Sequence, residues 1–470
     1  MDEKIVSPGI FWERCKHKIS PIAKTAFFSA VLIGLMIHMP ILIRDIPNHD
    51  GLDSIYFDQN MITSGRWFLT VACGISSYFS LPWVIGLLGI IYLGITSMLL
   101  CEFMEVKHHG SAVLISGILC AFPTLCATFA YVFTLDGYML AILLAVLAPF
   151  LVKQYKYGFI AGGVSLAFSL GIYQSYLTFA MLLSLYGIII LCLDNKTIKE
   201  KLRGMLDYLY MGIIGISLYY IILRVLLLIQ GKELASYQGI SGMGTVKKAG
   251  VWEIISNLYR DFFAFTFQSN ILFNNIWSLI AICLLVILFL LVLLHVVIHK
   301  KLYRSPWFYL ILLLLTAGLP IITNVIMIIS PTVTYHLLMR YQWVLYLICI
   351  IGFIEKYCKW NLGSWAMLLT AGILIFNYGV TDNIAYANIQ KKYEKTYALC
   401  IRLADRMEQA QGYERGMPVA MIGVVGDVNY PVTDITGPVT GSIIGMNGDY
   451  LLYTRSNYQL FLKHYLGITI

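Results

Sequence analysis

Three aspartates lie close together in the segment of residues 49–67, which reads HDGLDSIYFDQNMITSGRW. They are Asp50, Asp53 and Asp58. The preceding run, residues 21–43, is apolar and long enough to cross a hydrocarbon core of about 30 Å, so the aspartates are expected at or just beyond a membrane surface. A carboxylate held at an apolar boundary can have a raised pKa and act as a general base, which a hydrated loop seldom allows.

The composition indicates a membrane protein. Hydrophobic residues make up 59% of the 470 residues and charged residues 12%, with a mean hydropathy of +0.76. Soluble domains carry about 25% charged residues. We therefore expect an all-α polytopic membrane protein with about eleven transmembrane helices. The expected spans are residues 22–43, 81–102, 111–133, 137–152, 158–172, 176–193, 207–229, 276–298, 307–329, 341–355 and 363–380. The apolar stretch 68–80 is interrupted by glycine and serine and is expected to lie on the surface or to be re-entrant.

The distribution of lysine and arginine sets the expected orientation. If the N-terminus is cytoplasmic, the inner segments contain 17 of these residues and the outer connections seven. The positive-inside rule favours this topology, and an odd number of spans then places the C-terminus outside the cytoplasm. The first apolar run is too long, and lacks a small-residue cleavage site, to be a removable signal peptide. The net charge of +8 is assigned to membrane anchoring, and no nucleic acid partner is implied.

The composition changes after the last expected span. Residues 1–380 are expected to form the transmembrane domain, and residues 381–470 a small extracytoplasmic α/β domain. Within the latter, residues 386–411 have a helical pattern and residues 418–425 are typical of a short strand. Its single cysteine, Cys400, excludes a disulfide within the domain. We hypothesise that this domain helps to bind an acceptor.

Most side chains able to do chemistry fall in the expected outer connections. Besides the three aspartates these are Arg66, Asp136, Tyr173, Gln174, Lys247, Lys248, Arg260, Tyr335, His336 and Arg340. Acids, an amide, aromatic rings and cations on one face indicate a site more than a scaffold. Each residue also has a plain structural explanation, because aspartates cap helices, arginines reach the membrane interface, and tyrosine and glutamine pack between helices.

Four short motifs carry a family resemblance. They are the acidic first loop ending in GRW, the TLDG of residues 134–137, the YQSY of residues 173–176 and the HLLMRYQW of residues 336–343. In this order, between spans, they resemble the O-antigen glucosyltransferases associated with serotype-converting phages, and the resemblance covers essentially the whole chain. It implies the GT-C class of membrane glycosyltransferase. The implied reaction transfers a hexose, with glucose expected, from a polyprenyl phosphate (undecaprenyl phosphate glucose) to a cell-surface glycan such as O-antigen, at the outer face of the bacterial cytoplasmic membrane.

The resemblance also implies roles for the residues. An acceptor hydroxyl must lose its proton as it attacks the anomeric carbon, and by analogy the base comes from the first outer loop. Asp50 and Asp53 are both candidates, which would share a face if the loop is helical, and the sequence does not choose between them. Asp136 is a third catalytic candidate.

The leaving lipid phosphate needs cations placed in advance. His336 and Arg340 are four residues apart, so they are expected on one helix face at the mouth of a span. Arg66 and Arg260 are further donor-phosphate candidates. Tyr173, Gln174, Tyr335 and Asp58 are expected to contact substrate. A glycine-rich loop at residues 236–244 is expected to order over the lipid donor.

Two questions stay open in the sequence. Asp50, Asp53 and Asp136 are possible ligands of Mg²⁺ or Mn²⁺, but a metal-free site with arginine as the cation is equally consistent. Two other functions also remain, a flippase or transporter of lipid-linked oligosaccharides and a polysaccharide polymerase or ligase. A transporter predicts charge through the depth of the spans, where Arg224 is an exception in nearly uncharged segments. A polymerase usually needs a larger outer loop than residues 231–275.

Overall fold

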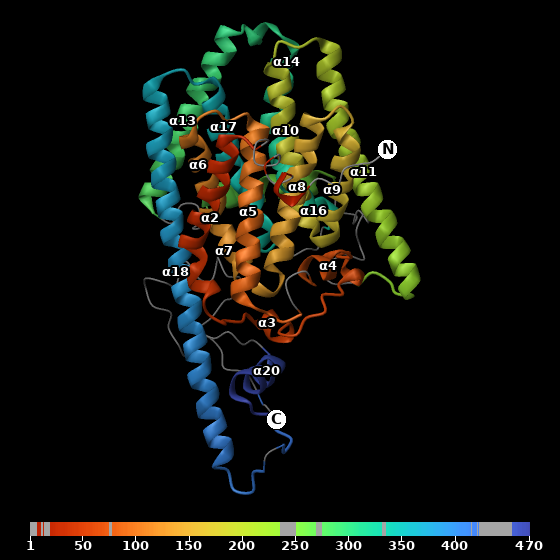
Figure 1. Cartoon of the computed structure of the whole chain (residues 1–470), viewed down its shortest axis with the longest axis vertical. Helices are drawn as coiled ribbons and strands as arrows, with labels where there is room; N and C mark the ends of the chain where they lie inside the picture. Colours follow the sequence, from red (N-terminus) through yellow and green to blue (C-terminus); the bar gives the residue numbers. More distant parts are fainter. Residues whose placement is uncertain are drawn as a thin grey trace.

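The computed structural model of the chain is a helical bundle with one long helix that extends past it (Figure 1). It describes residues 7–10, 13, 19–74, 78–235, 251–268, 275–330, 335–414, 416–420, 422 and 454–470. The main helices there are α2 (Pro21–Leu42), α3 (His49–Asp53), α4 (Leu69–Gly74), α5 (Pro82–Met104), α6 (His109–Ala121), α7 (Pro123–Phe129), α8 (Leu135–Gln154), α9 (Gly158–Ile172), α10 (Leu177–Leu193), α11 (Ile198–Gln230), α12 (Val251–Gln268), α13 (Ile276–His299), α14 (Pro306–Leu313), α15 (Leu319–Thr323), α16 (Val325–Ile329), α17 (Val344–Tyr357), α18 (Asn361–Glu408) and α20 (Arg455–Leu466).

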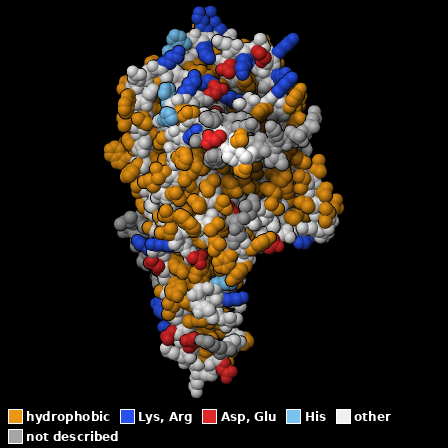
Figure 2. Space-filling model, viewed as in Figure 1, with side chains coloured by type: hydrophobic (Ala, Val, Ile, Leu, Met, Phe, Trp, Pro, Cys, Tyr) orange, Lys and Arg blue, Asp and Glu red, His pale blue; other side chains and the backbone are white. Residues whose placement is uncertain are grey.

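These helices confirm an all-α polytopic membrane protein. Among the described residues, nine helices are long and apolar enough to cross a bilayer, or ten if α6 and α7, bent by 52°, form one broken span. The one expected span that is not among them is residues 158–172, which form α9, a 15-residue apolar helix that is shorter than a usual span. It nevertheless returns the chain to the same end, because Thr134 before α8 and Tyr173 after α9 line one cavity. Apolar side chains cover the middle of the molecule and charged ones gather at its two ends (Figure 2).

Small residues let the helices approach closely. A Cβ on Gly94 of α5 would lie 2.8 Å from Phe27 of α2, and one on Gly86 would lie 2.1 Å from Leu42. Similarly, a Cβ on Gly163 of α9 would lie 2.6 Å from Ile214 of α11. Without a hydrophobic force between helices in lipid, such close packing holds a bundle together.

The two ends of the bundle differ in character. We name the end that carries α3 and α4, at the bottom of Figure 1, the α3 end. At the opposite end the Glu105 carboxylate joins three helices by contacting Lys153 at 2.7 Å and Lys356 at 3.0 Å. Burial raises the pKa of Glu105, but these two ammonium groups outweigh burial and lower the pKa to about 2.

Residues 361–408 form one helix of 48 residues, α18. At 1.5 Å per residue it is about 72 Å long, more than twice the hydrocarbon thickness. It runs without a break across residue 380, where the sequence suggested a domain boundary. The division into a transmembrane domain and a C-terminal domain stays a prediction. The described part of residues 381–470 contains the second half of α18 and the helix α20, and no strand. In the expected strand at 418–425, residues 418–420 and 422 are irregular, and the remaining residues lie outside the described part of the chain.

The C-terminal helix α20 packs between α18 and α3. Its Phe461 and Tyr465 rings lie 6.0 and 5.9 Å from that of Tyr393 on α18. The Asn457 side chain donates to the His49 carbonyl at 3.3 Å, and the Tyr465 hydroxyl donates to Asp45 at 3.3 Å. The last described helix therefore supports the segment that carries the first-loop aspartates.

Candidate active site

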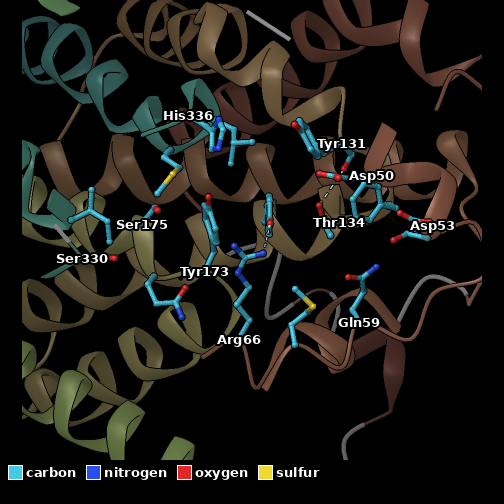
Figure 3. A pocket seen from close by; sticks show the side chains of 18 residues that line it. Asp50, Asp53, Gln59, Arg66, Tyr131, Thr134, Tyr173, Ser175, Ser330 and His336 are labelled. Carbon is cyan, nitrogen blue, oxygen red and sulfur yellow. Dashed lines mark hydrogen bonds between the residues drawn. The ribbon is translucent and has the colours of Figure 1, made fainter. Parts of the chain in front are cut away.

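A cavity of about 330 Å³ opens at the α3 end, and six of the residues singled out from the sequence line it (Figure 3). These six are Asp50, Asp53, Arg66, Tyr173, Gln174 and His336. The other lining residues are Ser54, Gln59, Met61, Tyr131, Phe133, Thr134, Tyr138, Ser175, Ile326, Ser330, Leu338 and Met339. Segments far apart in sequence therefore build one site.

The two carboxylates come from the short helix α3, as expected if the first loop is helical. Asn48 caps the helix, because its side chain accepts from the Gly51 N–H at 2.7 Å. The same side chain donates to the Ala130 carbonyl at 3.1 Å, which ties α3 to the residues before α8. Asp50 and Asp53 are both exposed, and Asp50 lies 3.3 Å from the His49 Nε2. Figure 3 shows Asp50 beside Tyr131 and Thr134, with Asp53 farther from His336.

Arg66 is the one arginine or lysine among the residues that line the cavity. Its guanidinium carbon lies 4.8 Å from the centroid of the Tyr173 ring, and its Nη1 donates to the Tyr138 hydroxyl at 3.4 Å. The Tyr138 and Tyr173 rings are stacked with centroids 4.6 Å apart. Two aromatic side chains thus hold the arginine in place, and a cation over an aromatic face gains about 0.5–2 kcal/mol.

Gly65 shapes the turn that presents Arg66. It has φ +76°, in the left-handed region that other residues avoid. A Cβ there would lie 2.5 Å from the Gln174 Nε2 and 2.6 Å from the Tyr219 hydroxyl. Gln174 donates to the Ser64 carbonyl at 3.0 Å and to the Tyr219 hydroxyl at 3.1 Å, and that hydroxyl donates to the Gly65 carbonyl at 3.1 Å. Gln174 therefore fastens the arginine turn to α11.

His336, the residue that directly precedes the helix of residues 337–343, also lines the cavity. Partial burial lowers the pKa of His336 below its usual 6.5, whereas the nearby Asp50 carboxylate acts in the opposite direction and raises this pKa. Because the lowering prevails, the imidazole is neutral at pH 7 and can both donate and accept a hydrogen bond.

The expectation that His336 and Arg340 share a helix face is wrong. Residues 337–343 form a 3-10 helix with three residues per turn, not an α-helix, and His336 only precedes it. Arg340 instead points to α12, where both terminal nitrogens contact the Asp261 carboxylate at 2.8 and 2.7 Å. Its guanidinium carbon also lies 4.0 Å from the Tyr335 ring centroid. In this structure the guanidinium pairs with that carboxylate, and its expected role as a phosphate clamp stays a prediction.

Three further residues singled out from the sequence also lie outside the cavity. Tyr335 packs on Arg340, and its hydroxyl accepts from the Gln342 side chain at 2.6 Å. Arg260 is exposed on α12, and Asp58 is exposed in the first loop. None of the three lines the cavity, so their contacts with substrate or phosphate stay predictions.

Asp136 is buried in the first turn of α8 and does not line the cavity. Its carboxylate accepts from the Gly137 N–H at 2.9 Å. This contact fits the structural explanation, in which the aspartate stabilises the start of a helix. Within the described part of the chain no three His, Cys, Asp or Glu side chains lie close enough together to hold a metal ion. The expectation that Asp50, Asp53 and Asp136 bind Mg²⁺ or Mn²⁺ stays a prediction.

Several cavity residues were missed in the sequence. Tyr131 and Tyr138 flank the TLDG motif, Thr134 is its first residue, and Ser175 lies within YQSY, so the motifs pointed to the right segments but these side chains were not singled out. Gln59 directly follows Asp58, the last of the three first-loop aspartates, and precedes Arg66 in the sequence. The carboxylate that pairs with Arg340, Asp261, is adjacent to Arg260, but no sequence spacing linked it to residue 340.

A family model described as glucosyl transferase GtrII matches residues 39–357, more than half of the chain. The chain belongs to this family. The match confirms the resemblance to serotype-converting glucosyltransferases, and it includes every residue that lines the cavity. Comparisons with curated proteins and with solved structures found no match. This member of the GtrII family is thus a multi-pass membrane glycosyltransferase whose matched region contains the candidate site, while α20 lies beyond that region.

Proposed function

We propose that this protein transfers glucose from a polyprenyl-phosphate donor to a cell-surface glycan at the outer face of the bacterial cytoplasmic membrane. In this proposal the N-terminus is cytoplasmic and the α3 end with α20 faces outward. The observation that carries the proposal is the cavity in which the α3 carboxylates lie across from the Arg66 guanidinium (Figure 3). Family membership supports glucosyl transfer over a flippase or a polymerase.

The chemistry is a single displacement with inversion at the anomeric carbon. Asp50 takes the proton of the acceptor hydroxyl while that oxygen forms its bond to C1 of the donor sugar. The bond between C1 and the phosphate oxygen breaks, and its electron pair leaves with the lipid phosphate. Arg66 offers fixed positive charge to that phosphate, and fixed charge needs no reorganisation during the reaction. The neutral His336 is available to hydrogen-bond sugar or phosphate.

We prefer Asp50 over Asp53 as the base because the imidazole of His49 contacts its carboxylate and restricts its orientation. Asp53, three residues on and also lining the cavity, is suited to bind a hydroxyl of the acceptor. Because α20 hydrogen-bonds the backbone of His49, the C-terminal segment also borders the side from which a glycan would approach.

The test measures transfer of radiolabelled hexose from synthetic polyprenyl-phosphate hexose to envelope glycan by purified protein. Asp50→Asn is expected to reduce the rate by about 10²- to 10⁴-fold, the usual contribution of a general base, with donor binding retained. Asp207→Asn is the control, since Asp207 is an aspartate of α11 that does not line the cavity. Loss only in Asp53→Asn would reassign the base. Full activity of both the Asp50 and Asp53 variants would refute catalysis from α3.

A further inference from the structure

A second cavity, about 1040 Å³ in volume, lies beside the candidate active site. One wall is α11, through residues that include Ile216, Leu223 and Leu227. The facing wall contains Leu170 of α9, Leu177 of α10 and Ile329 of α16. We name this space the α11 groove. It is a mainly aliphatic groove at the α3 end of the bundle.

The groove exists because α9 and α11 are in contact over only part of their length. Near residues 162–166 the helices meet through glycines: a Cβ on Gly162 would lie 3.2 Å from Met211, and one on Gly215 would lie 2.8 Å from Leu166. Beyond Gly215 the α11 residues that face the bundle, Tyr219, Leu223 and Leu227, are large, and α11 leans away from the bundle toward its C-terminal end, at the right of Figure 1. The lean exposes aliphatic side chains, including Leu228 at 80% exposure.

The groove adjoins the candidate active site. Gln174 lines both spaces. Helix α16 also contributes to both, with Ile326 in the active-site cavity and Ile329 in the groove. A molecule with a polar head in the cavity could therefore continue into the groove without leaving the protein surface.

The groove carries positive charge in an otherwise apolar span. Arg224 and Lys232 line it together with one acid, Glu233. The Arg224 Nε donates to the Tyr220 hydroxyl at 2.8 Å, and the guanidinium carbon lies 5.3 Å from that ring's centroid. Arg224 has no carboxylate within salt-bridge distance among the described residues. Charged side chains inside spans are costly and commonly mark a ligand path, and here the complementary ligand is an anion with an apolar tail.

We propose that the α11 groove binds the isoprenoid tail of the lipid donor, whose phosphate reaches the active-site cavity past Arg224 and Gln174. The assignment rests on the proposed function and specifies which helices receive the lipid. An ordinary phospholipid shares the anionic head and apolar tail, but only the donor must place its phosphate next to Arg66. The position of the groove next to that cavity, with Gln174 lining both, is what favours the donor.

The test compares two donors that differ only in tail length, an undecaprenyl-phosphate hexose and a two-isoprene analogue. Ile216→Trp fills the groove at a position that is 48% exposed, so the larger ring can be accommodated without disturbing the core. Ile221→Trp is the matched control, because Ile221 is 58% exposed on α11 and does not line the groove.

Ile216→Trp is expected to raise KM for the long donor by at least about tenfold, since losing two buried methylene groups weakens binding by that much. The short donor should be used as by the wild type, and the control should use both donors normally. Arg224→Gln should weaken both donors alike, because both carry the phosphate. A long-donor KM unchanged by Ile216→Trp, or equal losses on both donors in that variant, would overturn the assignment.

A second measurement separates this proposal from the proposed reaction. A polyprenyl phosphate with a photoreactive group on its tail should crosslink to peptides of α9, α10, α11 or α16, the helices that line the groove, whether or not transfer occurs, and excess ordinary phospholipid should not compete. Labelling of other helices, or full competition by phospholipid, would refute the groove as a donor site. Wild-type protein that is labelled on α11 but transfers from neither donor would instead refute the proposed function.

Discussion

Replacing Gly65 by alanine tests whether the turn before Arg66 is needed for activity. At φ +76° an L-residue is strained by roughly 1–2 kcal/mol relative to glycine. The new Cβ would also lie 2.5 Å from Gln174 and 2.6 Å from Tyr219, so at least one of these side chains must move. Each takes part in two hydrogen bonds at this turn, and each such bond contributes about 0.5–1.5 kcal/mol.

Backbone strain and lost hydrogen bonds together destabilise the conformation that holds Arg66 over Tyr173 by about 2–5 kcal/mol. Even 2 kcal/mol lowers the population of that conformation about thirtyfold, since each 1.36 kcal/mol is a factor of ten. We therefore expect Gly65→Ala to reduce kcat/KM for donor by about thirtyfold or more, while the overall fold persists because the strain is local.

The assay is the initial rate of hexose transfer in detergent, with the thermal unfolding midpoint measured on the same samples. Gly74→Ala is the matched control, because a Cβ on Gly74 of α4 meets nothing within 4 Å and its φ is not positive. A Gly65→Ala protein that transfers hexose within about twofold of wild type would show that Arg66 does not need this turn, and the argument would fail.

Three other perturbations follow from the same contacts. Arg66→Gln is expected to lower kcat/KM for the donor about 10- to 150-fold, because it removes one charge-assisted hydrogen bond of about 1.5–3 kcal/mol. Arg260→Gln should change kcat/KM by less than about twofold. Equal losses in the two variants would count against Arg66 as the phosphate ligand. Asp261→Asn leaves the Arg340 charge largely buried and is expected to destabilise α12 by about 3 kcal/mol, measured as faster proteolysis of residues 251–268; wild-type cleavage kinetics would contradict this. Glu105→Gln is expected to lower the free energy of unfolding by only about 1 kcal/mol, because the site is half exposed. Since the folded-state pKa of Glu105 is lowered to about 2, this difference from wild type should be present above pH 4.5 and disappear as the pH falls toward 2. A difference that grew on acidification would refute the assigned ion pairs.

The sequence alone determined the membrane class, the positions of the spans and the loops that build the site. Hydropathy is a local property, so each apolar run could be located without knowing its neighbours. The first-loop aspartates and the YQSY segment were found in the same way, because polar residues at the ends of spans stand out against an apolar background.

Which of those polar residues share a cavity was decided only by the tertiary structure. Arg340 and Arg66 look equivalent in sequence, but α12 places the Asp261 carboxylate against one, while Tyr138 and Tyr173 direct the other into the cavity. Asp136 and Asp50 are both aspartates close to a span, yet one is buried in the first turn of α8 and the other is exposed to the cavity. The α11 groove likewise depends on where two helices part. Side-chain partners and helix divergence arise from contacts between segments far apart in the chain, which no local pattern of residues encodes.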